Sequence, residues 1–151
     1  MEYALIDLDN NGIDELFVNV VGNCSADYYN AVYAFKDGAA KLLVDIPFVQ
    51  FQVYTDGTFS DCYGHTGYVE EKYYRVKDGS LITLLETEGH IESSKTGKDY
   101  TKWYLKKIGD KDVSYVACRK WIEKFQASHK EMKLPYKDNT SSNRASMLEK
   151  R

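Results

Sequence analysis

The side chains whose types and spacing could do chemistry lie near the start of the chain, in the run DLDNNGIDE at positions 7–15. Acidic and amide side chains alternate in this run, and a glycine comes three residues before the final glutamate. Hard cations such as Ca²⁺ take roughly six to eight oxygen ligands at about 2.3–2.6 Å, mostly from carboxylates and carbonyls. We therefore expect Ca²⁺ as a cofactor, bound by the side chains of Asp7, Asp9, Asn11 and Glu15 and by the main-chain carbonyl of Ile13.

Two other structures have to be weighed for an acidic loop of this kind. An EF-hand needs a bidentate Glu at its twelfth loop position and helices on both sides. The twelfth position counted from Asp7 is Val18, and the flanking residues have the pattern of strands, so an EF-hand is excluded. A metal-free turn stays possible, because Asp, Asn and Gly side chains and backbones also form turns by themselves. Closely spaced carboxylates without a cation would repel one another, and Asp14 adds a further one.

The run YALIDLDNNGIDELFV at positions 3–18 resembles the D-x-D-x-D-G-x-x-D/E-L strand–loop–strand element of FG-GAP and VCBS-type calcium loops. It is also similar to the opening of uncharacterised secreted or lipoprotein domains of gut Firmicutes. The resemblance implies the same five ligand positions and an extracellular or cell-surface location. Asn11 departs from the more common Asp of that element and removes one negative charge. The chain has one such loop, so a propeller of repeated loops is not implied.

The elements that must hold the loop in place are strands joined by short turns. Aromatic and β-branched residues suit a pleated, half-buried surface, and the chain contains 13 tyrosines and 2 prolines. Asp-Gly pairs between apolar runs predict tight hairpins, because glycine accepts a positive φ; such pairs stand at positions 37–38, 56–57 and 78–79. We expect strands at residues 3–6, 16–21, 29–35, 40–45, 51–54, 58–62, 69–76, 80–88, 90–91 and 100–105.

The pattern changes after Gly109, where apolar residues recur at intervals of three and four from Tyr115 to Phe125. This spacing predicts an amphipathic helix with Ser114 as its N-cap, running to about Lys130. The fold class expected is α+β: an antiparallel β-meander of Asp-Gly hairpins with this C-terminal helix packed on the sheet. We expect a single domain over 1–151, with the meander at 1–109, the helix at 112–130 and an extended or partly mobile tail at 131–151 that ends in one helical turn.

Weaker candidates for chemistry lie in the middle of the chain. Cys62 and His65 could form a nucleophile and a base, but closeness in sequence does not supply the geometry that catalysis needs. Glu86 and Glu88 would share one face of a strand, and with the pair Glu70-Glu71 they could suit acid–base chemistry on a sugar. Solvated strand faces carry such carboxylates more often. His90 and His129 have no partner at a ligand spacing.

Composition limits the partners and the compartment. The net charge of −3, without a basic stripe, argues against nucleic acid. The sequence has no run of about 18 apolar residues, so it predicts no membrane span. The N-terminal segment has no signal-peptide pattern, and we expect that upstream residues belong to the complete protein. The wide spacing of Cys24, Cys62 and Cys118 favours three reduced cysteines over one disulfide with a free thiol, and leaves the redox compartment open.

The function expected from these patterns is that of a calcium-stabilised structural or interaction module of an exported bacterial protein, without catalytic activity. Its partner would be an unknown protein or cell-surface component. One alternative is a carbohydrate-binding or carbohydrate-active domain that uses the tyrosine-rich sheet and its carboxylates. Another is a metal-free domain whose hairpins bind a partner protein.

Overall fold

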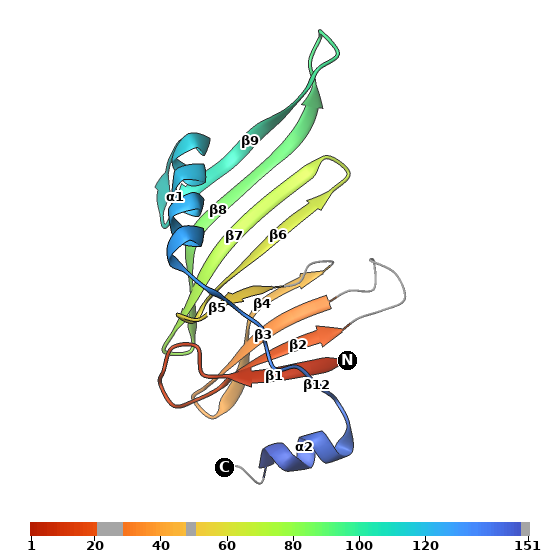
Figure 1. Cartoon of the computed structure of the whole chain (residues 1–151), viewed down its shortest axis with the longest axis vertical. Helices are drawn as coiled ribbons and strands as arrows, with labels where there is room; N and C mark the ends of the chain where they lie inside the picture. The colour runs from red at the N-terminus through yellow and green to blue at the C-terminus, as the bar shows by residue number, and fades with distance from the viewer. Residues whose placement is uncertain (21–28, 48–50, 149–151) are drawn as a thin grey trace. The chain divides into compact units, whose positions relative to one another are not determined.

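The computed structural model describes residues 1–20, 29–47 and 51–148 (Figure 1). Contacts between Cα atoms divide the chain into two compact units, each with its own antiparallel sheet. Unit 1 comprises Met1–Gln50, Asp78–Ser80 and Lys133–Arg151, and unit 2 comprises Phe51–Lys77 and Leu81–Met132. That both units belong to a single domain over 1–151 stays a prediction.

Unit 1 contains a five-stranded sheet with the strand order β12-β1-β2-β3-β4. Buried and half-buried residues alternate along β2, as expected for a strand with one face in the core. Phe17 on β2 and Val32 on β3 are opposite one another and have no exposed surface. The elements of this unit are β1 (Glu2–Ile6), β2 (Glu15–Val20), β3 (Tyr29–Lys36), β4 (Ala39–Pro47), β12 (Lys137–Asp138) and α2 (Ser141–Leu148).

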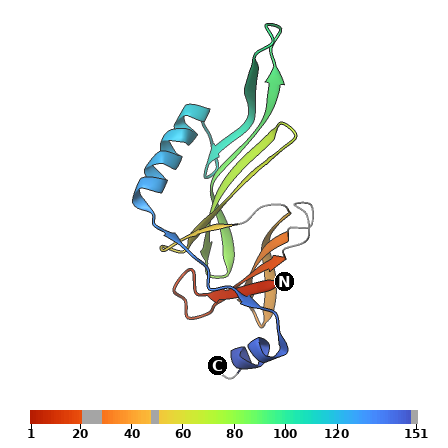
Figure 2. The ribbon, with the colours of Figure 1, turned by 45° about the vertical axis from the view of Figure 1, so that its right-hand side comes forward.

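Unit 2 contains a seven-stranded sheet with the order β10-β9-β8-β7-β6-β5-β11. The helix α1 (Tyr115–Ser128) lies along one face of this sheet (Figures 1 and 2). The strands are β5 (Gln52–Tyr54), β6 (Thr58–His65), β7 (Tyr68–Lys77), β8 (Ser80–Ser93), β9 (Asp99–Ile108), β10 (Lys111–Asp112) and β11 (Glu131–Met132).

The hairpin turns confirm the Asp-Gly predictions in two slightly different forms. Asp37-Gly38 and Asp78-Gly79 have positive φ at both residues, 56° and 78° in the first turn and 49° and 64° in the second. This is the backbone of a type I′ turn, whose twist matches that of the flanking strands. At Asp56-Gly57 only the glycine has a positive φ, 79°. A further turn joins β6 to β7 at Thr66-Gly67, with φ of 50° and 82°, which agrees with the interpretation of Gly67 as a turn or bulge residue.

The helix α1 begins where the capping pattern predicted. The Ser114 hydroxyl accepts a hydrogen bond from the main-chain N–H of Ala117 at 3.2 Å, which satisfies one of the free donors of the first turn. The apolar stripe of the helix packs against the strands of unit 2. The buried residues of this core are Tyr54, Tyr73, Leu85, Cys118, Ile122 and Phe125.

The α+β fold, an antiparallel meander with a helix packed on the sheet, is confirmed, while three local predictions need correction. The separate strand predicted at residues 90–91 is part of β8, which runs without a break to Ser93 and pairs with β9. The tail has short extended segments, β11 and β12, but it ends in the eight-residue helix α2 in place of the single helical turn expected. The fold has twelve strands among the described residues, more than the eight to ten expected. Val21 and Cys24 lie outside the described residues.

Candidate metal centre

The acidic loop joins β1 to β2 and brings three of the predicted ligands together. Asp7, Asp9 and Glu15 each offer a carboxylate oxygen, and these three oxygens lie within 4.8 Å of one another. Two ligands of one Ca²⁺ ion lie at most about 5 Å apart, because each is about 2.3–2.6 Å from the metal. The separation therefore suits a single ion.

Hydrogen bonds from the main chain fix the shape of the loop. The Asp7 carboxylate accepts one from the N–H of Asn11 at 3.0 Å and one from the N–H of Gly12 at 2.8 Å. The side-chain oxygen of Asn11 accepts the N–H of Ile13 at 2.7 Å. Gly12 has a positive φ of 82°, and Asn10 adopts a φ of 57°. The loop is therefore closed by its own side chains, and metal coordination by Asn11 and by the Ile13 carbonyl stays a prediction.

Glu15 is the buried member of the cluster. Its side chain has 1% exposed surface, and its Oε2 accepts the main-chain N–H of Leu8 at 2.9 Å. Burial raises the pKa of Glu15 to about 7; the Leu8 hydrogen bond opposes this, and the charges of Asp9 and Asp7 add to it. A buried carboxylate next to two others costs free energy unless a proton or a cation compensates it.

Asp9 supplies a further indication that a ligand belongs here. Its Oδ2 accepts the main-chain N–H of Asp78, also in unit 1, at 2.6 Å. Its Oδ1 is buried and has no hydrogen-bond partner among the described residues. Buried carboxylate oxygens are normally paired, so an orphaned one has to be explained by a missing partner such as an ion or water. The contact with Asp78 could not be predicted, because no local pattern links residues so far apart in sequence.

The other candidates from the sequence differ in their surroundings. Cys62 is an exposed residue of β6. Partial burial of its thiol, with the charges of Glu71 and Asp61, raises the pKa of the thiol, which disfavours the reactive thiolate. His65 contacts the hydroxyl of Thr66 through Nδ1 at 2.6 Å. Among the described residues, no hydrogen bond joins the Cys62 thiol to the His65 ring. Cys62 and Cys118 are both free cysteines.

The carboxylates of the sheet are engaged by basic side chains. Lys72 lies 3.2 Å from Glu70 and 3.1 Å from Glu86, so these two glutamates share one cation. Glu71, on the opposite face of β7, pairs with Arg119 of α1 at 3.2 Å. Of the two predicted pairs, Glu70-Glu71 is therefore divided between the two faces of the sheet, whereas Glu86 and Glu88 are two residues apart on β8 and share one face.

A row of aromatic rings crosses four strands of unit 2. Ring centroids are 5.8 Å apart between Tyr63 and Tyr68, 5.1 Å between Tyr68 and His90, and 5.9 Å between His90 and Tyr104. Tyr68 and Tyr73 are both on β7 and are separated by an odd number of positions, so their side chains lie on opposite faces of the sheet. The ring of Tyr73 packs on Phe125 of α1, with centroids 4.9 Å apart. Side chains alternate between the faces of a strand, so the row lies on the face of the sheet that α1 does not cover.

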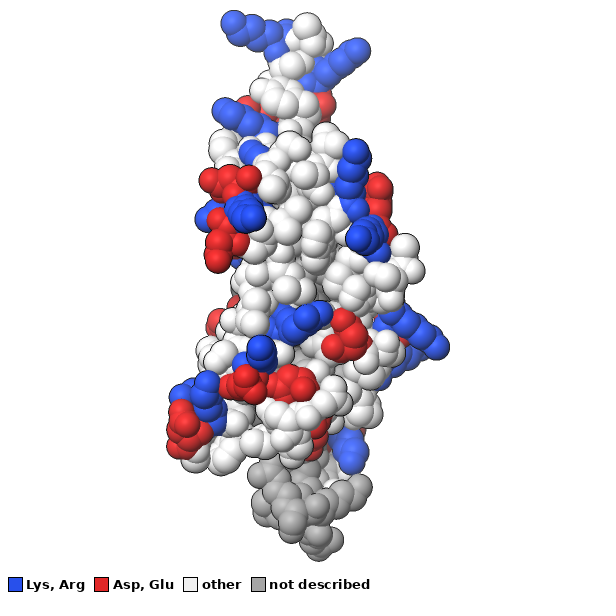
Figure 3. Space-filling view, turned by 90° about the vertical axis from the view of Figure 1, so that its left-hand side faces the viewer, with Lys and Arg blue, Asp and Glu red and all other residues white. Residues whose placement is uncertain are grey.

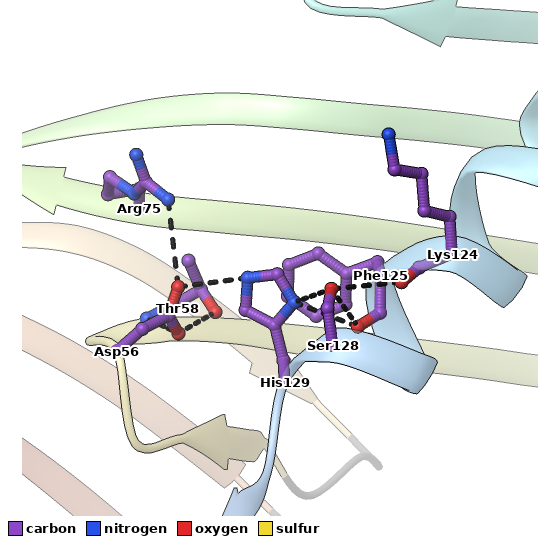
Figure 4. A network of polar contacts seen from close by, with 7 residues as sticks. All are labelled: Asp56, Thr58, Arg75, Lys124, Phe125, Ser128 and His129. Carbon is purple, nitrogen blue, oxygen red and sulfur yellow. Dashed lines mark hydrogen bonds and ion pairs between the residues drawn. The ribbon is translucent and has the colours of Figure 1, made fainter.

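A second polar network surrounds the C-terminal end of α1 (Figure 4). His129 Nε2 lies 3.0 Å from the carboxylate of Asp56, and His129 Nδ1 lies 2.9 Å from the hydroxyl of Ser128. This order of groups resembles that of a serine nucleophile, but Nδ1 is also 2.8 Å from the carbonyl of Phe125. A carbonyl only accepts, so Nδ1 carries a hydrogen and cannot take a proton from Ser128. The Ser128 hydroxyl donates to the carbonyl of Lys124 at 2.9 Å, and the network caps the helix.

Comparison with protein-family models, curated proteins and solved structures finds no match to this chain. The interpretation of the site therefore depends on its own residues. No helix in the described ranges is both long and apolar enough to span a membrane. Basic and acidic side chains are interspersed over the face shown in Figure 3.

Proposed function

We propose that the protein is a calcium-stabilised structural or interaction module of an exported bacterial protein. The observation that carries this proposal is the meeting of three carboxylates within 4.8 Å, one of them on a side chain with 1% exposed surface. The charges that act on Glu15 are those of Asp9 and Asp7, which have the same sign. A divalent cation would offset two of the three negative charges and give the orphaned oxygen of Asp9 a partner. The exported setting is supported by the resemblance of the opening run alone.

The role proposed for the metal is to fix the hairpin of β1 and β2. Asp7 and Asp9 follow β1 directly, and Glu15 is the first residue of β2. An ion bound to all three would join the two strands at the turn, beyond the five residue pairs of their ladder. It would also stabilise the burial of Glu15 in its ionised form. Binding to the folded state alone raises stability by mass action.

Thermal unfolding with and without calcium tests the proposal. At a calcium concentration 100 times its Kd, binding adds about 2.7 kcal/mol, which for a chain of this length corresponds to a rise in Tm of roughly 5–10 °C. We expect this rise in the wild type and in Asp14→Ala, because Asp14 is exposed and outside the cluster. We expect no rise in Asp7→Ala/Asp9→Ala. An equal rise in that double variant would refute the calcium site.

A second measurement keeps the test independent of how well the double variant folds. The main-chain N–H groups of Asn11 and Gly12 donate to Asp7, so their NMR signals should move when calcium binds the wild type. Calcium that leaves both signals in place would contradict the proposal. Both tryptophans are in unit 2, so their fluorescence is not suitable for following this loop.

The aromatic row favours carbohydrate binding as a second candidate function. Tyr104 and Tyr100 are 52% and 49% exposed, and both hydroxyls donate to Glu92, at 2.5 and 3.1 Å. The Tyr68 hydroxyl donates to Glu70 at 2.7 Å. These bonds hold the rings in place before a ligand arrives, which lowers the entropy cost of binding. Ring faces beside acceptor-only carboxylates suit the C–H faces and hydroxyl donors of a sugar.

A glycan array tests this second function. Binding of an oligosaccharide that is lost in Tyr104→Ala and kept in Tyr33→Ala, which changes a half-buried tyrosine of unit 1, would support it. If no glycan on the array binds, and no glycan shifts the NMR signals of the aromatic row, carbohydrate binding would be refuted. Neither outcome of the glycan array bears on the calcium site, which is tested by the calcium dependence of the melting temperature.

A further inference from the structure

A pocket of about 290 Å³ lies between α1 and the strands β7 and β8 of unit 2. Leu84, Trp121 and Phe125 form its apolar wall, and Arg75 and Lys124 bring basic side chains to it. Figure 4 shows Arg75 on β7 and Lys124 on α1, with the rings of Phe125 and His129 between them. We call this cavity the α1 pocket.

The wall of the α1 pocket is a stack of rings along one stripe of the helix. Trp121 and Phe125 are stacked with centroids 5.0 Å apart and planes 16° apart, and Phe125 and His129 follow at 3.7 Å and 8°. Residues four apart share a helix face, which aligns the three rings. Tyr73 packs edge-on against Trp121 at 5.2 Å and keeps the stack from turning. A rigid aromatic wall of this kind suits a flat, apolar ring.

The charged side chains that line the α1 pocket are basic. No Asp or Glu is among the described residues that line it. The carboxylate of Asp56 contacts two of the lining residues, Arg75 and His129. Arg75 has one ion pair, with Asp56 at 3.6 Å, which is longer than a hydrogen bond. The carbonyls of Lys124 and Phe125 at the negative end of the helix are already covered by the Ser128 hydroxyl. The pocket therefore presents donors to an anion.

We propose that the α1 pocket binds a small aromatic carboxylate, with the ring against Trp121 and Phe125 and the carboxylate between Arg75 and Lys124. A guanidinium is suited to a carboxylate because it can donate two parallel N–H bonds. Small-molecule sites are mostly apolar with a few placed polar groups, and their volumes begin at about 300 Å³. The α1 pocket is at this lower limit, so it fits one ring with an acidic group and excludes a nucleotide.

The site was not predicted from the sequence, and it is independent of the proposed calcium loop, which belongs to unit 1. The helix pattern identified Trp121 and Phe125 as core residues. Only the fold adds Arg75, which is 46 positions before Trp121 in the sequence. The pairing of β7 with β8 next to α1 is what brings them together.

Fluorine NMR of the full chain labelled with 5-fluorotryptophan tests the proposal, with phenylacetate as the ligand and neutral phenylacetamide as its control. The chain has two tryptophans, and Trp103→Phe assigns the signals. We expect saturable binding with a Kd on the order of 0.1–1 mM, a shift at Trp121 and none at Trp103. We expect phenylacetamide to bind at least about ten-fold more weakly.

Variants test the role of the two cations. Arg75→Gln/Lys124→Gln should weaken phenylacetate at least about ten-fold and leave phenylacetamide unchanged. Lys120→Gln, at an exposed position of the same helix, is the matched control and should bind like the wild type. No saturable shift in the wild type up to about 10 mM ligand would overturn the proposal. So would equal binding of the acid and the amide, or a shift at Trp103 in place of Trp121.

Discussion

The buried carboxylate of Asp61 on β6 allows a quantitative prediction. Its side chain is 1% exposed. Burial raises the pKa of Asp61 from 3.8 to about 6; the Tyr74 hydroxyl and the charge of Lys72 oppose this only in part. A carboxylate with a raised pKa in the folded state stabilises the fold below pH 3.8 and loses that contribution as the pH rises through about 6.

The magnitude follows from the difference between the two pKa values. About two pH units correspond to about 3 kcal/mol between the protonated and ionised forms. Asp61→Asn removes the titration, so its stability relative to the wild type should increase between pH 4 and pH 7 and then stay constant. The new amide must also find partners, which reduces the gain, and we expect a net stabilisation of about 1–3 kcal/mol at pH 8.

Urea unfolding followed by tryptophan fluorescence is the assay, because Trp103 and Trp121 both report on unit 2, which contains Asp61. Measurements at pH 4, 5, 6, 7 and 8 would trace the difference between variant and wild type. Asp110→Asn, at an exposed turn position of the same unit, should stay within about 0.5 kcal/mol at every pH. A difference for Asp61→Asn that does not change with pH, or a variant less stable than the wild type at pH 8, would refute the reasoning.

Three further substitutions have definite expected outcomes by the same urea assay. Gly89→Ala should cost about 1–3 kcal/mol, because its Cβ would lie 2.9 Å from the ring of Trp103; Gly64→Ala, with 3.8 Å to its nearest atom, should cost much less. Ser114→Ala should cost about 1 kcal/mol by removing the N-cap, and Ser114→Asp should restore it. Asp56→Asn should destabilise at pH 7 and converge with the wild type in acid. Burial raises the pKa of Asp56, but hydrogen bonds and charges outweigh it and hold the pKa below 3.8, so its contribution is present above that pH and is lost as the pH falls.

Each of these would be contradicted by a distinct result. An equal loss of stability for Gly89→Ala and Gly64→Ala would mean that the Trp103 ring moves to make room for the new Cβ. An Ala variant at Ser114 as stable as the wild type would mean that water replaces the cap. A constant effect of Asp56→Asn down to pH 2 would mean that the carboxylate charge is not what stabilises the turn.

Local chemistry made much of the fold predictable. Asp37-Gly38 and Asp78-Gly79 identified their turns because few other dipeptides accept positive φ at both positions. Ser114 and the spacing of Tyr115 to Phe125 located α1. The carboxylates of the acidic loop could be brought together from sequence because they lie within nine residues.

What could not be predicted depends on contacts between distant segments. Nothing in Lys137-Asp138 indicates a partner, yet β12 pairs with Glu2 and Tyr3 of β1. The Asp56 carboxylate meets His129 only because β5 and β6 lie next to the end of α1. The meander also divides into two sheets. The residue pattern within a strand shows which face is buried but does not show which neighbouring strand it pairs with, so this division could not be predicted.

The pairing of β12 with β1 has a consequence for the order in which the chain can fold. Unit 1 draws its strands from both sides of unit 2 in the sequence, so the sheet of unit 1 gains its last strand only after residue 138 has been made. Unit 2 is complete by residue 132. During synthesis it can therefore close as a finished insert while β1 still has one edge free. Closing a loop of this length is slow but costs little extra free energy, and the open edge of β1 is the part of the nascent chain that a chaperone would have most reason to cover.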